Sequence, residues 1–357
     1  MRLHRLWLTD FRNYTSAEVE LAPAGLTVLV GGNGQGKTNL IEAVGYLATL
    51  DSFRGAPTDA LVRAGCATAV VRAEAERAGR ELLVEAEITA GGRARTLLNH
   101  QPLRRASELL GAVRVSVFSP DDLELVKGGP AGRRRYLDNT LVGLHPRNAP
   151  MRTDLERILR QRNALLKQCR GRLDESAGTT LDVWDTKLAA TGEAMAEARD
   201  RGPARPATSS TRAYDQLAGT PADVEVVYER SWRGRLSEAL AAARPDDVRR
   251  GVSTVGPHRD DVRLGIAGMP ARTHASQGEQ RSLALALRLA AHRITAEAVG
   301  ESPVLLLDDV FSELDAARAA ALVAHLPEGQ VLLTTAGDVP SGAHAARTLR
   351  LHGGAIR

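Results

Sequence analysis

A glycine-rich segment near the N-terminus constrains this chain more than any other feature. Residues 31–38 read GGNGQGKT and fit the pattern GxxxxGK followed by Ser or Thr. The segment follows an apolar run over residues 26–30 that predicts a buried strand, and it leads into an apolar-periodic stretch over residues 37–50 that predicts a helix. A glycine-rich loop between a strand and a helix is typical of a phosphate-binding loop. The first part of the chain is therefore predicted to be an α/β structure.

The residue types in this loop suit the triphosphate of ATP, bound together with Mg²⁺. Glycines let backbone N–H groups curl around the β-phosphate, and the helix N-terminus adds the positive end of its dipole. Lys37 is expected to reach the β- and γ-phosphates, and the Thr38 hydroxyl is expected to ligate Mg²⁺. The candidate nucleotide-binding residues here are Gly31, Gly32, Asn33, Gly34, Gln35, Gly36, Lys37, Thr38 and Asn39.

A pair of carboxylates follows an apolar strand much later in the chain. Residues 303–307 read PVLLL and are followed by Asp308 and Asp309, which is the form of a Walker B segment. Asp308 is then a candidate Mg²⁺ ligand beside Thr38, and Asp309 a candidate catalytic residue with Lys37, because in-line hydrolysis needs a carboxylate near the attacking water. Two acids after a strand also occur as a solvated helix cap. Their combination with the loop at 31–38 favours the nucleotide site.

A third segment indicates the subclass of nucleotide-binding protein. Residues 276–280 read SQGEQ and open an amphipathic helix predicted over residues 279–295. This looks like the signature motif of ABC proteins, in which Ser276 and Gly278 of one protomer contact the γ-phosphate held by Lys37 of a second copy. The same residues also make an ordinary capping box. Residues 312–315 fall where ABC proteins carry the D-loop. Gln280 of the signature segment and Asp315 of the D-loop segment therefore join the candidate nucleotide-binding residues of an ATP-dependent homodimer.

The order of these motifs predicts the domain organisation. The glycine-rich loop and the acid pair lie about 270 residues apart, so the N- and C-terminal parts must form one head. Between them the chain is rich in Ala, Leu, Glu and Arg at helical spacing, without the sustained heptads of a coiled coil. We therefore predict a head over residues 1–126 and 251–357 with a helical arm over 127–250. Residues 202–212, GPARPATSSTR, are predicted to be a linker or loop.

Charge suggests a polyanionic partner without identifying it. The net charge is +4, and from Lys127 to Arg172 there are twelve basic residues against three acids. Such an excess would give salt-sensitive, sequence-independent DNA binding, and the alternative is a solvated arginine-rich helix face. Few aromatic residues are interleaved, which favours duplex or junction contacts over base stacking. No long apolar run or signal peptide is present, so we expect a cytoplasmic protein without membrane contact.

Six ordered blocks of the sequence resemble the RecF family of ABC/SMC-like ATPases. These are FRNY (11–14), GGNGQGKTNLIEA (31–43), FSPDDLELVKGGPAGRRRYLD (118–138), STVGPHRDD (253–261), SQGEQRSLALALRLA (276–290) and LLLDDVFSELD (305–315). The resemblance covers nearly the whole chain except residues 140–250. It implies an ABC/SMC-type P-loop ATPase head with an inserted helical arm, weak DNA-stimulated ATP hydrolysis used as a switch, and a dimeric clamp on DNA. It further implies action with RecR and RecO in placing RecA at single-stranded gaps during repair, replication restart and the SOS response.

The sequence departs from general ABC proteins at two places. No clear Q-loop glutamine precedes the arm, and Thr334 and Thr335 occupy the region where an H-loop histidine is usual. An ABC transporter ATPase, the main alternative, would carry both features and a compact helical subdomain. A structural SMC-like tether would need long heptad arms, which are absent. His258, in the block GPHRDD, is more typical of a turn residue than of a catalyst.

Overall fold

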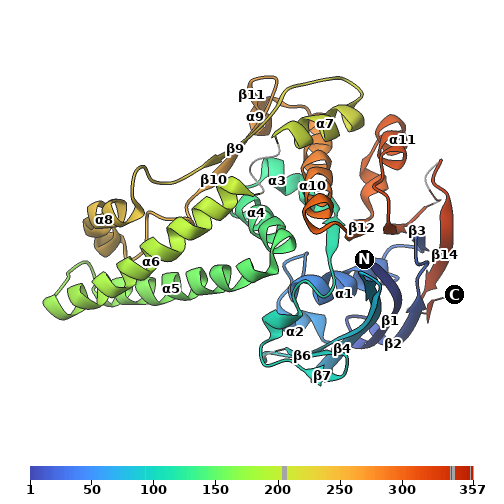
Figure 1. Cartoon of the computed structure of the whole chain (residues 1–357), viewed down its shortest axis with the longest axis horizontal. Helices are drawn as coiled ribbons and strands as arrows, with labels where there is room; N and C mark the ends of the chain where they lie inside the picture. The colour runs from blue at the N-terminus through green and yellow to red at the C-terminus, as the bar shows by residue number, and fades with distance from the viewer. Residues whose placement is uncertain (93, 203–206, 338, 340–341, 354, 357) are drawn as a thin grey trace. The chain divides into compact units, whose positions relative to one another are not determined.

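Two sets of segments, interleaved along the chain, form separate units in the computed structural model (Figure 1). The structure describes residues 1–92, 94–202, 207–337, 339, 342–353 and 355–356. Unit 1 consists of residues 1–126, 208–222 and 275–357, and unit 2 of residues 127–207 and 223–274. No helix among the described residues is both long enough and apolar enough to cross a membrane.

Unit 1 is built from two six-stranded sheets and the helices that accompany them. Its strands are β1 (Arg2–Phe11), β2 (Tyr14–Glu20), β3 (Gly25–Val30), β4 (Thr68–Arg77), β5 (Arg80–Thr89), β6 (Arg95–Leu98), β7 (Gln101–Pro102), β8 (Val115–Phe118), β12 (Val304–Asp308), β13 (Gln330–Thr335), β14 (Ala345–His352) and β15 (Ala355–Ile356). Its helices are α1 (Lys37–Thr49), α2 (Thr58–Leu61), α3 (Leu123–Lys127, at the unit boundary), α7 (Ala207–Ala218), α10 (Gln277–Val299) and α11 (Ala316–Ala324).

The sheet that carries the candidate site has the strand order β15-β14-β3-β13-β12-β8. All its neighbouring pairs are parallel except β14 with β15. Strands β12 and β13 are buried along their whole length, which explains the unbroken apolar runs over residues 304–307 and 331–333. The carboxyl ends of β3, β12 and β13 meet at one edge, where β3 leads into the glycine-rich loop and β12 ends at Asp308.

The second sheet, in the order β2-β1-β4-β5-β6-β7, is antiparallel and faces the core on one side only. Strand β4 shows this directly, because Ala69, Val71, Ala73 and Ala75 are buried and alternate with more exposed residues. Helix α1 contacts strands of both sheets. Its residues 40–47 are all buried, which is expected of a helix that is covered on every side.

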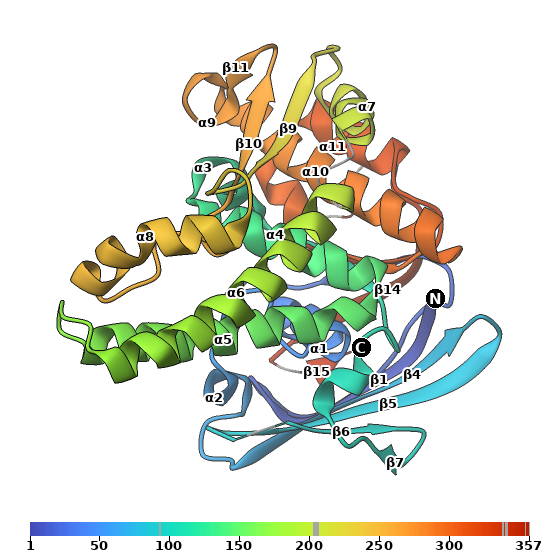
Figure 2. The same ribbon diagram turned by 60° about the vertical axis from the view of Figure 1, so that its left-hand side comes forward.

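Unit 2 combines helices with a small antiparallel sheet. Its helices are α4 (Pro130–Leu144), α5 (Ala149–Gln168), α6 (Glu175–Arg201), α8 (Leu236–Arg250) and α9 (Ala271–His274), and its strands, in the order β11-β10-β9, are β9 (Val224–Glu229), β10 (Asp261–Ile266) and β11 (Met269–Pro270). Helices α5 and α6 lie side by side in both Figure 1 and Figure 2 and contact each other. Their core includes Leu155, Ile158, Leu188, Trp232 and Leu236.

The observed division differs from the predicted one in two segments. Residues 251–274 lie in unit 2 rather than with the C-terminal part of the head, because β10 pairs with β9 over six residues. Residues 208–222, predicted to belong to the arm, lie in unit 1. The segment 202–212, predicted to be a linker or loop, also differs in part. Residues 203–206 lie outside the described residues, whereas Ala207–Ala218 is helix α7, whose Ala213, Tyr214 and Leu217 are buried in unit 1. Burial of this face outweighs the weak helix propensity of its Ser and Thr residues.

Candidate nucleotide-binding site

The glycine-rich loop connects β3 to α1 and has the backbone shape that its glycines allow. Gly34 and Gly36 have positive φ angles of 77° and 99°, which side chains disfavour. Helix α1 begins at Lys37. Gly36 has no side chain to cap it, and the first turn of the helix, described in full by the structure, contains no acidic residue. The first backbone N–H groups of α1 are therefore available to an anion, as the predicted phosphate site requires.

The Lys37 side chain contacts the backbone of the glycine-rich loop that would bind a phosphate. Its Nζ donates to the carbonyl oxygens of Gly31 at 2.6 Å and Gly32 at 2.8 Å. Burial lowers the pKa of this ammonium, and the carboxylates of Asp309 and Asp308 act in the opposite direction. An anion beside Nζ would stabilise a charge that the protein alone only partly compensates.

The acid pair meets the loop at the end of β12. The Thr38 hydroxyl donates to Asp308 Oδ1 at 2.9 Å, and the Thr334 hydroxyl, from β13, donates to the same oxygen at 2.8 Å. Burial raises the pKa of Asp308, although both hydrogen bonds lower it. A buried carboxylate beside a threonine hydroxyl is a donor set that suits a hard cation such as Mg²⁺. The residues present therefore fit both a triphosphate and the cation that accompanies it.

The FRNY segment supports the loop from β1, β2 and the turn between them, a role that the sequence alone did not indicate. Arg12 makes two hydrogen bonds to the fully buried Glu42 of α1, at 2.7 and 2.8 Å. Asn13 Oδ1 accepts a hydrogen bond from Asn39 at 2.7 Å, and the Tyr14 hydroxyl donates to the Gly36 carbonyl at 3.0 Å. Arg12, Asn13 and Tyr14 thus each contact the loop or the helix that follows it. The block was visible in the sequence, but its partners are 22 to 30 residues away.

The predicted signature segment forms the N-terminus of α10. Ser276 and Glu279 make a complete capping box, in which Ser276 Oγ accepts from the Glu279 amide at 3.3 Å. A hydroxyl that accepts in a cap keeps its own hydrogen to donate, so the capping box and a phosphate contact are compatible. Ser276 is exposed and Gly278 half-buried, whereas Gln280 is 4% exposed and faces the core.

The D-loop segment lies against the signature segment within the same unit. Arg281 of α10 pairs with Glu313 and also donates to its carbonyl oxygen at 3.0 Å. Asp315 caps α11 by accepting from the Arg318 amide at 2.8 Å and forms an ion pair with the Arg318 side chain. An ideal Cβ built on Gly278 would lie 2.9 Å from Arg318 Nη2, so this arginine contacts the first turn of α10.

The arginine run at 133–135, part of the stretch predicted to contact DNA, pairs instead with the block at 253–261 within unit 2. Arg133 makes hydrogen bonds of 2.7 and 3.0 Å to Asp261, and Arg134 donates to the Asp260 carbonyl at 2.7 Å. Burial lowers the pKa of His258 to about 4, and its Nε2 is 3.0 Å from the Ser253 carbonyl. These contacts indicate that Arg133, Arg134 and the segment 253–261 stabilise unit 2.

Comparison with known proteins identifies the family to which this architecture corresponds. The family model described as the RecF/RecN/SMC N-terminal domain matches residues 2–338. The chain is 44% identical over 393 residues to the DNA replication and repair protein RecF of Kineococcus radiotolerans, and 44% identical over 383 residues to that of Frankia alni, with both chains covered completely in each case.

Solved structures agree with the sequence relatives. A structure described as the recombination mediator protein RecF with ATPrS in the RecFOR pathway has a TM-score of 0.90 and 28% identity, covering 99% of this chain and 97% of the other. An SMC head described as bound to the C-winged helix domain of ScpA has a TM-score of 0.59 and 17% identity, covering 100% and 96%. The second likeness concerns the fold alone. The predicted ABC/SMC-type P-loop ATPase head is confirmed.

Proposed function

The chain belongs to the RecF family of DNA replication and repair proteins, and we propose that it works as an ATP-switched DNA clamp. The observation that carries the proposal is the joining of the loop to the acid pair, with Thr38 Oγ1 2.9 Å from Asp308 Oδ1 across 270 residues of sequence. A threonine of a phosphate-binding loop beside a buried carboxylate is the arrangement that holds a triphosphate together with its cation.

Each residue of the loop and the acid pair has a distinct task in this proposal. The loop amides and Lys37 hold the phosphates, while Thr38 and Asp308 hold Mg²⁺, which neutralises phosphate charge when it is bound. Asp309 orients the attacking water and accepts its proton. Hydrolysis is slow and DNA-stimulated, and it serves to reopen the clamp.

The clamp closes when two heads share their nucleotides. Ser276, Gly278 and Asp315 are exposed or half-buried on one side of the head, and they contact the γ-phosphate held by Lys37 of a second copy. Gln280 supports this surface from beneath, because its side chain is buried. The dimer forms with ATP and dissociates after hydrolysis.

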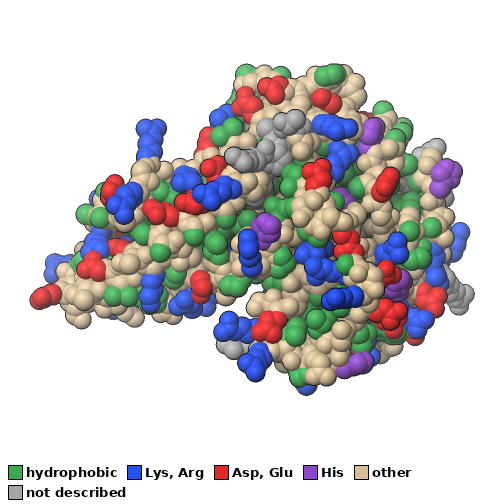
Figure 3. All heavy atoms as spheres, viewed as in Figure 1, with side chains coloured by type: hydrophobic (Ala, Val, Ile, Leu, Met, Phe, Trp, Pro, Cys, Tyr) green, Lys and Arg blue, Asp and Glu red, His purple; other side chains and the backbone are tan. Residues whose placement is uncertain are grey.

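DNA binds unit 2 through phosphate contacts. Not all twelve basic residues between 127 and 172 can take part, because Arg133 and Arg162 are buried in ion pairs. Arg157, Arg160 and Lys167 are exposed on the face of α5 opposite its buried residues. Figure 3 shows basic side chains over α5 and α6 with acidic ones between them. Such a surface suits weak, salt-sensitive backbone contact rather than base reading.

The relatives support a proposal for the wider pathway. A RecF structure is described in the context of the RecFOR pathway, so we propose RecO and RecR as partners and RecA placement at single-stranded gaps as the outcome. The protein would act in the cytoplasm, where it meets DNA.

Analytical ultracentrifugation with and without ATP and Mg²⁺ tests the clamp. We expect ATP to convert monomer to dimer, Lys37→Met and Ser276→Arg to prevent this, and Asp309→Asn to accumulate an ATP-bound dimer that retains DNA. A protein that stays monomeric with ATP, and whose DNA affinity ignores nucleotide, would exclude the clamp.

A further inference from the structure

Thr334 occupies an unusual position beside the acid pair. It is the penultimate residue of β13, is 1% exposed, and lies directly opposite Asp308 in the parallel register of β12 and β13. In the sequence this position stands out only because it is not a histidine. The structure shows instead what the threonine contacts.

The Thr334 hydroxyl contacts both acids at once. It donates to Asp308 Oδ1 at 2.8 Å and accepts a hydrogen bond from the Asp309 backbone amide at 2.9 Å. A hydroxyl has one hydrogen and two lone pairs, so a single oxygen can perform both tasks.

Both bonds constrain groups that the local chain does not hold by itself. Asp309 has a φ angle of 49°, in the left-handed region that costs free energy for a residue with a side chain. The bond from its amide to Thr334 holds this turn and therefore the point on the backbone from which its carboxylate extends. At Asp308, Thr334 and Thr38 both bind Oδ1, which fixes the rotation of the carboxylate from two sides.

We propose that Thr334 is a positioning residue that orients both carboxylates, Asp308 toward the cation and Asp309 toward the water. The proposal rests on the ATP site proposed above. One hydroxyl then sets the placement of Asp308, the cation ligand, relative to Asp309, the base. The position requires a hydroxyl group rather than a side chain of a given volume.

The chain offers a matched control in the next residue. Thr335 is also a buried threonine at the end of β13, 8% exposed, but its hydroxyl accepts from the Gly337 amide at 3.1 Å. Thr334→Val and Thr335→Val therefore remove the same atoms from neighbouring positions. Thr334→Ser restores the hydroxyl without the methyl group.

The experiment measures affinity for a fluorescent ATP analogue with Mg²⁺ and with EDTA, and single-turnover hydrolysis, on the full chain. For Thr334→Val we expect the gain in affinity that Mg²⁺ provides, and the turnover rate, each to fall about ten- to a hundredfold, the effect of losing a hydrogen bond to a charged group. Affinity in EDTA should stay within about twofold, because the contacts of Lys37 are unchanged. Thr334→Ser and Thr335→Val should resemble the wild type in all three measurements.

Two results would overturn the proposal. One is a Thr334→Val protein that matches Thr335→Val in Mg²⁺ dependence and turnover; the other is a Thr334→Ser protein as impaired as Thr334→Val. If Thr334→Val does not fold, Thr334→Ala replaces it in the same comparison. Failure of the wild type to bind the analogue with Mg²⁺ would instead remove the proposed ATP site, and this inference with it.

Discussion

Gly36 ends the phosphate-binding loop at a point where both backbone angle and space exclude a side chain. Its φ is 99°, and an ideal Cβ would lie 2.6 Å from Asn13 Nδ2 and 2.8 Å from the Tyr14 hydroxyl oxygen. Gly34 shares the positive φ, at 77°, but nothing lies within 4 Å of its Cβ position. A substitution at Gly34 therefore tests backbone strain alone, whereas one at Gly36 tests backbone strain together with steric clash.

We expect Gly34→Ala to lower the free energy of unfolding by about 1 kcal/mol, the cost of the left-handed backbone alone. Gly36→Ala should cost about 2–4 kcal/mol, because it also displaces the side chains of Asn13 and Tyr14. Urea unfolding measures both values. Equal costs for the two variants would show that the FRNY contacts do not constrain the loop.

His292 of α10 is a buried neutral histidine. Burial lowers its pKa to about 4 from the ordinary value of 6.5, and its two ring nitrogens lie 2.9 and 3.2 Å from the hydroxyls of Ser116 and Ser302. The unfolded chain takes up a proton below pH 6.5, whereas the folded chain does so only near pH 4. Stability from this group is therefore complete above pH 6.5 and is lost as the pH falls toward 4.

This sign gives a prediction for pH-dependent unfolding. Between pH 6.5 and about 4.5 the wild type should lose about 1.4 kcal/mol per pH unit more than a His292→Gln variant. His352→Gln, at an exposed position of β14, serves as the control and should follow the wild type. Parallel curves for His292→Gln and the wild type would show that the imidazole is accessible to protons in the folded state.

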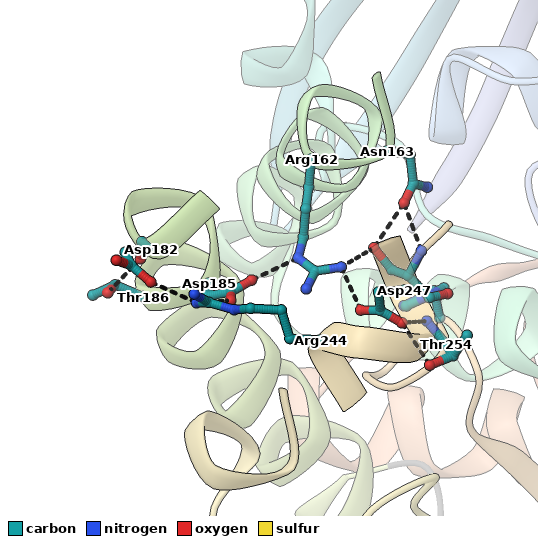
Figure 4. Close-up of polar contacts among 10 residues, drawn as sticks. Arg162, Asn163, Asp182, Asp185, Thr186, Arg244, Asp247 and Thr254 are labelled. Atoms are coloured by element: carbon teal, nitrogen blue, oxygen red, sulfur yellow. Dashed lines mark hydrogen bonds and ion pairs between the residues drawn. The ribbon is translucent and has the colours of Figure 1, made fainter. Parts of the chain in front are cut away.

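At the scale of elements, α5, α6 and α8 are joined by one buried guanidinium (Figure 4). Arg162 of α5 is fully buried, and it donates to Asp185 of α6 at 2.7 Å and to Asp247 of α8 at 2.7 Å. Asp247 also accepts from the amide and hydroxyl of Thr254. The charge is thus paired on two sides, which is the condition for burying it.

Arg162→Met should therefore destabilise the chain strongly, because it leaves the buried Asp247 without its cation and Asp185 with Arg244 alone. We expect a loss of about 3–5 kcal/mol in unfolding free energy. Arg157→Met removes an exposed ion pair with Asp154 on the same helix and should cost less than about 1 kcal/mol. A small loss for Arg162→Met would mean that water or a rearranged α8 satisfies Asp247.

At the scale of the whole molecule, the proposed DNA surface predicts a specific salt dependence. Replacing Arg157, Arg160 and Lys167 by Ala should reduce the slope of log K against log salt by about 0.9 for each phosphate that is no longer neutralised. A control with Arg2, Arg80 and Arg350 replaced by Ala removes the same charge from exposed positions of unit 1. Fluorescence anisotropy with duplex DNA measures both. Equal changes in the two variants would indicate an effect of net charge rather than an α5 interface.

The sequence by itself determined the loop, the acid pair and the class of fold. These features are local. A GKT sequence after one apolar strand, and two aspartates after a second apolar strand, each specify the local backbone conformation within about ten residues. Their joining into one head could be predicted because neither motif binds a triphosphate alone. The roles of Lys37, Asp309 and the signature residues stay predictions until the variants are measured.

Only the tertiary structure decided which residues share a partner. Arg133 and Arg135 are equivalent in sequence, yet the first is buried against Asp261, 128 residues away, and the second is exposed. Strand β10 belongs to unit 2 because it pairs with β9, and Thr334 lies beside the acid pair because β13 is the neighbour of β12. Contacts between residues so far apart in the sequence depend on strand order and helix packing. Burial of the whole core, rather than any local sequence pattern, determines both.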